Sequence, residues 1–256
     1  YPGFVVSDWG SIGEMVDHGY AKDKYQAAEL AIKAGSDMDM ESRSYLPYLA
    51  KLVQEKKVPV SLVDDAVRRI LRKKFELGLF DDPYRFSSED RQVKELNTAE
   101  NRQAALSMAE KSIVLLKNEK QILPLSKGFK KIAVVGPLAK SEKDMQGFWS
   151  ISWQNDQLVS LFQGLKNKVG DHTELLYAKG CEIADSSTTG FAEALRVAKQ
   201  SDVIIVAVGE TLDMSGEAKS RAHIRIPGVQ EDLIKALQHT GKPVVVLVMA
   251  GRPLIF

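Results

Sequence analysis

The chain has 256 residues, of which 44% are hydrophobic, and its 35 Lys and Arg nearly balance 34 Asp and Glu, for a formal net charge of +1. This length and composition predict one large domain or two ordinary ones with a buried core, and they exclude a disordered chain. The balanced charge creates no global field for nucleic acid or anionic lipid, and no run approaches the roughly 18 apolar residues of a membrane span.

The single cysteine, Cys181, cannot form a disulfide within the chain. The four histidines are scattered and have no acidic or cysteine partners at the spacing of a metal site. We therefore expect no metal, no cofactor and no internal disulfide. The chain starts without Met, just before an apolar run, and stops just after another, so we expect both ends to continue in a longer protein.

Short apolar runs alternate with helical patterns in the first 80 residues or so. A brief run ends at Asp8-Trp9-Gly10, and residues 25–33 have the composition of a helix. A second short strand reaches residues 37–40, and a longer helix follows, opened by Ser61 and carrying apolar residues as far as Phe75. This alternation predicts a parallel α/β sheet or barrel, with functional groups at the C-terminal ends of the strands.

A polar, charged segment predicts a linker at residues 83–101, between a first domain at residues 1–82 and a second at residues 102–256. In the second domain, apolar runs alternate with helical patterns, which predicts an open α/β sandwich. The expected strands are residues 132–135, 174–178, 203–208 and 243–249, and the expected helices are residues 159–168, 191–200 and 229–239.

Asp8 closes a buried strand, immediately before an aromatic residue and a glycine. A carboxylate at this end of an α/β strand occupies the position of a reactive group, and Trp9 offers a flat apolar face on which a sugar ring can pack. An Asp after a strand can equally be the N-cap of the next turn or helix. From the residues alone, both interpretations of Asp8 stay open.

Glu217 lies in a polar stretch, residues 211–226, after the strand that ends at Gly209-Glu210. A glutamate on such a loop can reach the cleft of a neighbouring domain, although it can also be a solvated surface acid. Glu210 is a rival because it is nearer the strand end and more rigidly placed. Trp149 and Trp153 belong to an aromatic loop, which serves either core packing or a sugar platform.

Several motifs occur in an order that is informative as a set. They are Gly3-Phe-Val-Val-Ser-Asp-Trp-Gly10, Ala34-Gly-Ser-Asp-Met-Asp-Met40, Phe75-Glu-Leu-Gly-Leu-Phe80, Ser112-Ile-Val-Leu-Leu-Lys-Asn118 and Gly251-Arg-Pro253. Together they resemble glycoside hydrolase family 3, which contains β-glucosidases and β-xylosidases. The resemblance implies the C-terminal part of a (β/α)8-type barrel followed by an α/β sandwich that is incomplete at its C-terminus. It also implies Asp8 as nucleophile, Glu217 as acid/base and Trp9 as an aromatic beside the sugar, with Trp149 a further candidate for substrate contact.

The function implied by the resemblance is that of a retaining exo-β-glycosidase, foremost a β-glucosidase that acts on terminal β-glucosyl residues of short oligosaccharides. Retaining hydrolysis needs one carboxylate that attacks and one carboxyl that protonates the leaving oxygen, about 5 to 5.5 Å apart. The alternatives are a β-xylosidase, a glycosidase of mixed specificity and a non-catalytic carbohydrate-binding protein. A nucleotide-binding oxidoreductase is disfavoured because Val135-Gly136-Pro137 has one glycine where a dinucleotide fingerprint needs three.

The expected partners are a β-glucoside substrate and the missing N-terminal barrel and C-terminal segments of the same enzyme, with neither nucleic acid nor membrane. Because the sugar-binding barrel strands that would precede Tyr1 are missing, we expect the isolated chain to be inactive. A periplasmic or extracellular location is implied by the resemblance alone.

Overall fold

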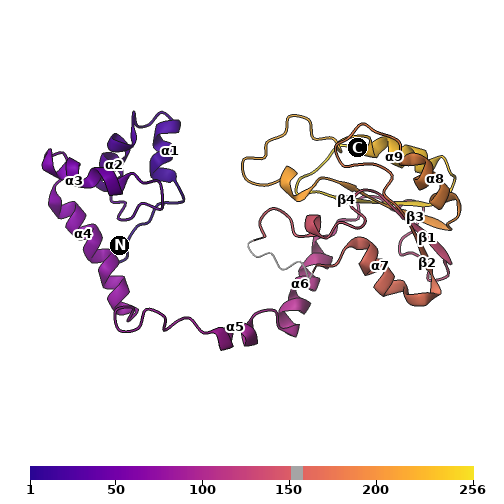
Figure 1. Cartoon of the computed structure of the whole chain (residues 1–256), viewed down its shortest axis with the longest axis horizontal. Helices are drawn as coiled ribbons and strands as arrows, with labels where there is room; N and C mark the ends of the chain where they lie inside the picture. The colour runs from indigo at the N-terminus through magenta and orange to yellow at the C-terminus, as the bar shows by residue number, and fades with distance from the viewer. Residues whose placement is uncertain (151–157) are drawn as a thin grey trace. The chain divides into compact units, whose positions relative to one another are not determined.

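The computed structural model describes residues 1–150 and 158–256, and the chain forms two compact units, Tyr1–Val114 and Leu115–Phe256. The first unit is mainly helical, and the second combines a sheet with helices (Figure 1). Within the described residues, no helix has the length and apolar character needed to cross a membrane. The α/β class predicted from the sequence is confirmed.

The core of the first unit lies among its first four helices, which are α1 (Ser11–Asp17), α2 (Lys24–Lys33), α3 (Tyr45–Gln54) and α4 (Val60–Glu76). Helix α2 is central because it packs against the other three. Its buried face consists mainly of alanines, and Ala27 and Ala28 are completely buried. Small side chains at this face let the neighbouring helices approach α2 closely.

The two short apolar runs of the first unit pair with each other in parallel, through an isolated bridge between Val6 and Met38. The Ser7 amide donates to the Met38 carbonyl at 3.0 Å, and the Met38 amide donates to the Val5 carbonyl at 3.1 Å. Because α1 and α2 lie between the paired segments in the chain, this is the crossover connection that parallel strands require. The pairing agrees with the expected last strands of a barrel.

Helix α2 agrees with the predicted range, and the Asp23 side chain caps it by accepting from the Gln26 amide at 2.8 Å. The predicted start of α4 was wrong. The N-cap is Pro59, in an extended conformation, and Ser61 lies inside the first turn. Pro59 is tolerated just before the first helical residue because a backbone N–H there would have no partner within the helix.

The segment predicted as a linker contains helix α5 (Glu89–Glu95) and the start of α6 (Ala99–Ser112). Hydroxyl side chains cap both helices: Ser88 accepts from the Arg91 amide, and Thr98 accepts from the Asn101 amide. The described residues of both helices are all partly or fully exposed. Local capping therefore orders this polar segment without a core of its own.

The described residues of the second unit form a four-stranded parallel sheet in the order β2-β1-β3-β4. The strands are β1 (Lys131–Val135), β2 (Glu174–Ala178), β3 (Val203–Gly209) and β4 (Val244–Met249). The helices are α7 (Leu161–Val169), α8 (Phe191–Lys199) and α9 (Gln230–Gln238), with short 3-10 helices η1 (Lys143–Met145), η3 (Gly170–His172) and η4 (Leu212–Met214). The predicted ends of these four strands and three α-helices agree with the observed ends to within two residues.

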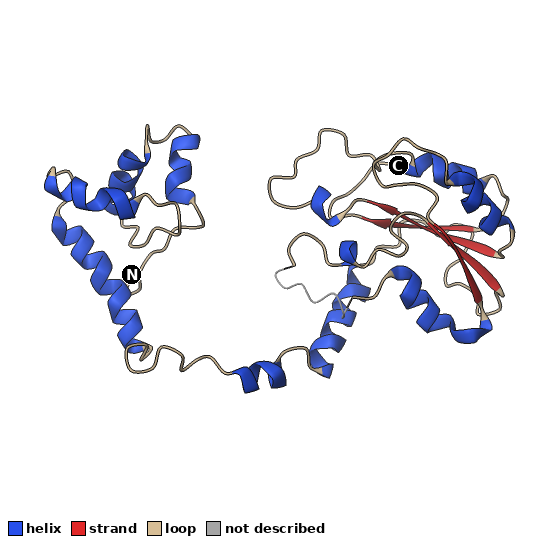
Figure 2. Cartoon of the chain, in the orientation of Figure 1, coloured by secondary structure: helices blue, strands red, loops and turns tan. Residues whose placement is uncertain are grey.

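Helices cover both faces of this sheet (Figure 2). Alternate strand residues, such as Ala133 and Val206, face a cluster that includes α8 and α9, whereas Val134 and Ile205 face a cluster that includes α7. Every residue of β3 is buried, as expected of a central strand in a parallel sheet that is covered on both faces.

The strand order changes direction between β1 and β3, because β2 lies on one side of β1 and the later strands lie on the other. In open parallel sheets, ligands bind beside the carboxyl ends of the strands at such a switch point. Glu210 directly follows β3 at this edge.

Candidate active site

Asp8 lies in the first unit, just after the bridge at Val6, and its side chain is exposed. Its carboxylate accepts from the Trp9 amide at 2.7 Å, and its carbonyl accepts from the Ser11 amide at 3.3 Å. The N-cap of α1 is Gly10, so Asp8 does not cap this helix. Trp9 is 66% exposed, which leaves its ring available for contact.

The backbone around Asp8 is attached to the neighbouring segment on both sides. The Met40 amide donates to the Ser7 hydroxyl at 2.8 Å, and the Gly10 amide donates to the Met40 carbonyl at 2.8 Å. Asp39 in turn orders the turn that follows Met40. Burial raises the pKa of Asp39, but hydrogen bonds from the Ser42 hydroxyl and from nearby backbone amides outweigh burial, so this pKa is lowered overall.

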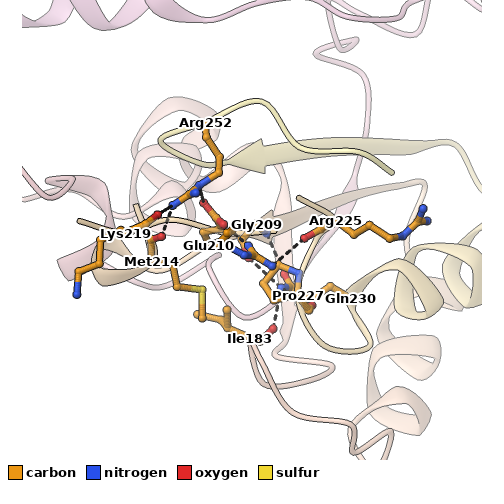
Figure 3. Close-up of polar contacts among 10 residues, drawn as sticks. Ile183, Gly209, Glu210, Met214, Lys219, Arg225, Pro227, Gln230 and Arg252 are labelled. Carbon is orange, nitrogen blue, oxygen red and sulfur yellow. Dashed lines mark hydrogen bonds and ion pairs between the residues drawn. The ribbon is translucent and has the colours of Figure 1, made fainter. Parts of the chain in front are cut away.

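The two glutamate candidates of the second unit lie in different environments. The Glu210 side chain is 1% exposed, and both of its oxygens are ion-paired. Oε1 pairs with Arg221. Oε2 pairs with the Arg252 Nε at 3.2 Å (Figure 3). Glu217 lies further along the same loop and is exposed. Both carboxylate oxygens of Glu210 are therefore occupied by partners within the fold, whereas the Glu217 side chain is accessible to solvent.

A hollow of about 410 Å³ lies at the carboxyl edge of the sheet. Its lining comes from three loop segments, within residues 144–149, 210–216 and 249–251. Trp149 lines it, is 70% exposed and meets the Phe148 ring edge-on at 5.2 Å. Trp149 is therefore not packed in the core of the second unit, and its use as a sugar platform stays a prediction. Trp153 lies outside the described residues.

The segment with Trp149 and the segment with Glu217 are attached to each other. Asp144 accepts from the Leu212 amide at 2.8 Å, and Lys143 pairs with Asp213 at 3.2 Å. Gly216 has a φ of +137°, and a side chain there would overlap the Phe148 ring. The chain therefore needs glycine at this position for both its backbone conformation and its close contact with Phe148.

The structure thus brings Trp149, Glu210 and the start of the Glu217 loop around one hollow, while Asp8 and Trp9 belong to the other unit. Among the described residues, no group of three or more His, Cys, Asp or Glu side chains could hold a metal ion.

Family comparison identifies both units. Residues 113–256 match the glycosyl hydrolase family 3 C-terminal domain, and residues 1–73 match the glycosyl hydrolase family 3 N terminal domain. The chain belongs to glycosyl hydrolase family 3. The resemblance found in the sequence motifs is confirmed: the first unit contains the match to the N terminal domain of this family, and the second contains nearly all of the match to its C-terminal domain.

Individual relatives in glycosyl hydrolase family 3 agree along the chain. A periplasmic beta-glucosidase of Salmonella typhimurium is 41% identical over 99% of this chain and 36% of its own length. A beta-xylosidase of Formosa agariphila is 39% identical over 99% of this chain and 37% of its own length. The crystal structure of a beta-glucosidase from Listeria innocua in complex with isofagomine has a TM-score of 0.88 and 36% identity, and it matches 99% of this chain and 35% of that one. The chain thus spans little more than a third of these relatives.

Sequence reasoning missed three residues that organise the edge of the sheet: Arg221, Arg252 and Gln230. Arg252 lies in the Gly251-Arg-Pro253 motif, which is one of the motifs that carry the family resemblance, but the resemblance implies no role for this arginine. Arg252 and Gln230 act through contacts 42 and 47 positions away in the sequence, and Arg221 acts through a contact 11 positions away, so local pattern gives little sign of any of them.

Proposed function

We propose that this chain is part of a retaining exo-β-glycosidase and carries both catalytic carboxylates, Asp8 as nucleophile and Glu217 as acid/base. The observation that carries the choice of Glu217 is the engagement of Glu210: both Glu210 oxygens face guanidinium groups, so neither is free to deliver a proton to a substrate. Glu217 is exposed, on a loop attached to the Trp149 segment.

The reaction is a double displacement. Asp8 attacks the anomeric carbon while Glu217 protonates the departing oxygen, and the glycosidic bond between this carbon and this oxygen breaks. Glu217, now ionised, then takes a proton from water as that water attacks the anomeric carbon and releases Asp8. The two carboxyl groups must be about 5 to 5.5 Å apart, and because they belong to different units, the docking of the units must set that distance.

We assign a β-glucoside as the first candidate substrate and a β-xyloside as the second, since the similar proteins include a beta-glucosidase and a beta-xylosidase at 41% and 39% identity. A periplasmic location is proposed from the first of these relatives. We further propose residues 1–82 as the end of the barrel, residues 83–101 as the linker and residues 102–256 as the sandwich. The remaining segments of the enzyme complete the sugar pocket, and no cofactor takes part.

The experiment compares the complete protein that contains this chain with Asp8→Ala and Glu217→Ala, on activated aryl β-glucosides and β-xylosides. Asp17→Ala and Glu193→Ala are matched controls, because each removes an exposed acid of the same unit. Asp8→Ala should abolish turnover, and both controls should match wild type. Glu217→Ala should retain activity on the activated substrate and gain rate with azide, which displaces Asp8 from the anomeric carbon and yields a glycosyl azide.

If Glu217→Ala behaves like Glu193→Ala, the acid/base lies elsewhere and Glu210 is the next candidate. Full activity of Asp8→Ala would refute the assignment of the nucleophile. A complete protein that binds glucosides but cleaves none would favour the non-catalytic alternative.

A further inference from the structure

Arg252 contacts the Glu217 loop on both sides of Glu217. Its Nη2 donates to the Met214 carbonyl before Glu217 and to the Lys219 carbonyl after it, the latter at 2.9 Å (Figure 3). One guanidinium nitrogen thus fixes the two ends of a six-residue segment that has Glu217 in its middle.

The backbone within this segment has a conformation that chains rarely adopt. Gly216 has a φ of +137° and Ala218 a φ of +57°, so the residues on either side of Glu217 both lie at positive φ. Alanine at positive φ is unfavourable and persists only where surrounding contacts hold it. Within the segment, the Lys219 amide donates to the Gly216 carbonyl at 3.3 Å, which is a long hydrogen bond. The bonds from Arg252 are therefore a substantial part of the restraint on this turn.

Arg252 is itself held by the rigid edge of the sheet. Its Nε pairs with Glu210 at 3.2 Å, and the Glu210 amide donates to the carbonyl of Met249, the last residue of β4, at 2.9 Å. Further along, the Ile255 amide donates to the Ile224 carbonyl at 2.8 Å, which attaches the far end of the loop to the chain that follows Arg252. The ends of β3 and β4 thus supply a fixed base for a loop whose own secondary structure is the short 3-10 helix η4.

We propose that Arg252, held in place by the buried Glu210 carboxylate, is a positioning residue for Glu217. Arg252 makes no contact with substrate in this role; it fixes the turn from which the acid/base side chain projects. This inference rests on the proposed function of Glu217. Proton donation requires the acid within hydrogen-bond reach of the leaving oxygen, so a small displacement of the turn reduces acid catalysis while leaving the attack by Asp8 intact.

The test uses the complete protein and a series of β-glucosides whose leaving groups range from dinitrophenolate to a simple alkoxide. Leaving groups that depart as stable anions need little protonation, whereas alkoxides depend on it. We expect Arg252→Met to lower kcat/KM by about 10²-fold for the alkyl glucoside, in line with the usual size of acid catalysis, and only a few-fold for the dinitrophenyl glucoside. Arg196→Met, which removes an arginine from an exposed ion pair on α8, should match wild type on every substrate.

Two further variants apply if Arg252→Met does not fold. Arg252→Lys keeps a positive charge beside Glu210 but has a single nitrogen that cannot replace the fork of contacts, so it should show the same dependence on the leaving group. Glu210→Gln removes the charge that holds Arg252 and should also follow this pattern. Azide should not accelerate either variant, because each keeps the Glu217 carboxylate.

An equal loss of rate on all glucosides in these variants, or no loss, would overturn the positioning role. Azide acceleration of Glu210→Gln would overturn it as well, since Glu210 would then be the acid. Failure of the proposed function gives a different result: Glu217→Ala would itself show neither dependence on the leaving group nor rescue by azide.

Discussion

Gln230 connects the end of β3 to the loop that returns from the candidate acid. It is completely buried at the start of α9, its Oε1 accepts from the Gly209 amide at 2.9 Å, and its Nε2 donates to the Gly209 carbonyl at 2.9 Å. The same Nε2 donates to the carbonyls of Ile183 at 2.9 Å and Pro227 at 3.0 Å. Gly209 is in register with Met249 of β4, but the pairing of β3 with β1 stops at Val206, so the side-chain amide replaces the strand partner that Gly209 lacks on the β1 side.

Gln230→Leu keeps the size of the side chain and removes all of these hydrogen bonds. The Gly209 N–H and C=O are then buried without partners, at about 1–3 kcal/mol for each group. The expected destabilisation is roughly 2–6 kcal/mol, a large part of the 5–15 kcal/mol that is typical of a folded domain.

The assay is amide hydrogen exchange followed by mass spectrometry, on peptides from β3 and β4 of the complete protein. A loss of 2 kcal/mol raises the population of the open state roughly 30-fold, and exchange of these strands should accelerate accordingly. Gln238→Leu is the matched control, since Gln238 is exposed on the same helix and should change stability by less than about 0.5 kcal/mol. If Gln230→Leu exchanges like Gln238→Leu, the account of Gly209 is wrong.

Three further outcomes are expected. Gly209→Ala should lower the thermal unfolding midpoint far more than Gly241→Ala. Both glycines have positive φ, which costs about 1–2 kcal/mol for alanine. Only at Gly209 would a side chain also overlap the Met249 carbonyl. The lowered pKa of Asp39 means that its carboxylate stabilises the fold above its unfolded pKa of about 3.9 and that this contribution is lost as pH falls through the folded value. The difference in stability between wild type and Asp39→Asn should therefore be largest at pH 7 and should shrink as the pH falls below the unfolded pKa, as denaturant titrations at several pH values would measure. Burial raises the pKa of Cys181 to about 11, so iodoacetamide at pH 8 should label it slowly in the folded protein and quickly in denaturant, as mass spectrometry would measure.

The sequence predicts the second unit better than the first. Strands buried on both faces have continuous apolar runs, and β2 (Glu174–Ala178) was predicted with its observed ends. In the first unit, three helices were not predicted: α5 lies in the segment predicted as a linker, α1 contains Gly13, and α3 contains Pro47 in its first turn. Both residues disfavour helices in isolation, but Gly13 is buried and Pro near a helix start leaves the backbone hydrogen bonds intact.

Local pattern also limits what can be predicted about the site. Motif order identifies Asp8, because the strand before it and the aromatic residue after it are adjacent in sequence. The choice between Glu210 and Glu217 depends on Arg252, which pairs with Glu210 across 42 positions of the chain. A contact of that range exists only once the sheet is assembled, so sequence alone left both glutamates open.

The buried ion pairs of Glu210 support a positioning role better than a purely stabilising one. Removing two charges from water costs several kcal/mol each, and a well-packed apolar pair often serves stability equally well. An apolar replacement would nevertheless lose the bonds from Arg252 to the carbonyls of Met214 and Lys219, which only a donor at this position can supply. The charge on Glu210 is therefore explained by its pairing with Arg252: it holds the guanidinium that hydrogen-bonds the turn around Glu217.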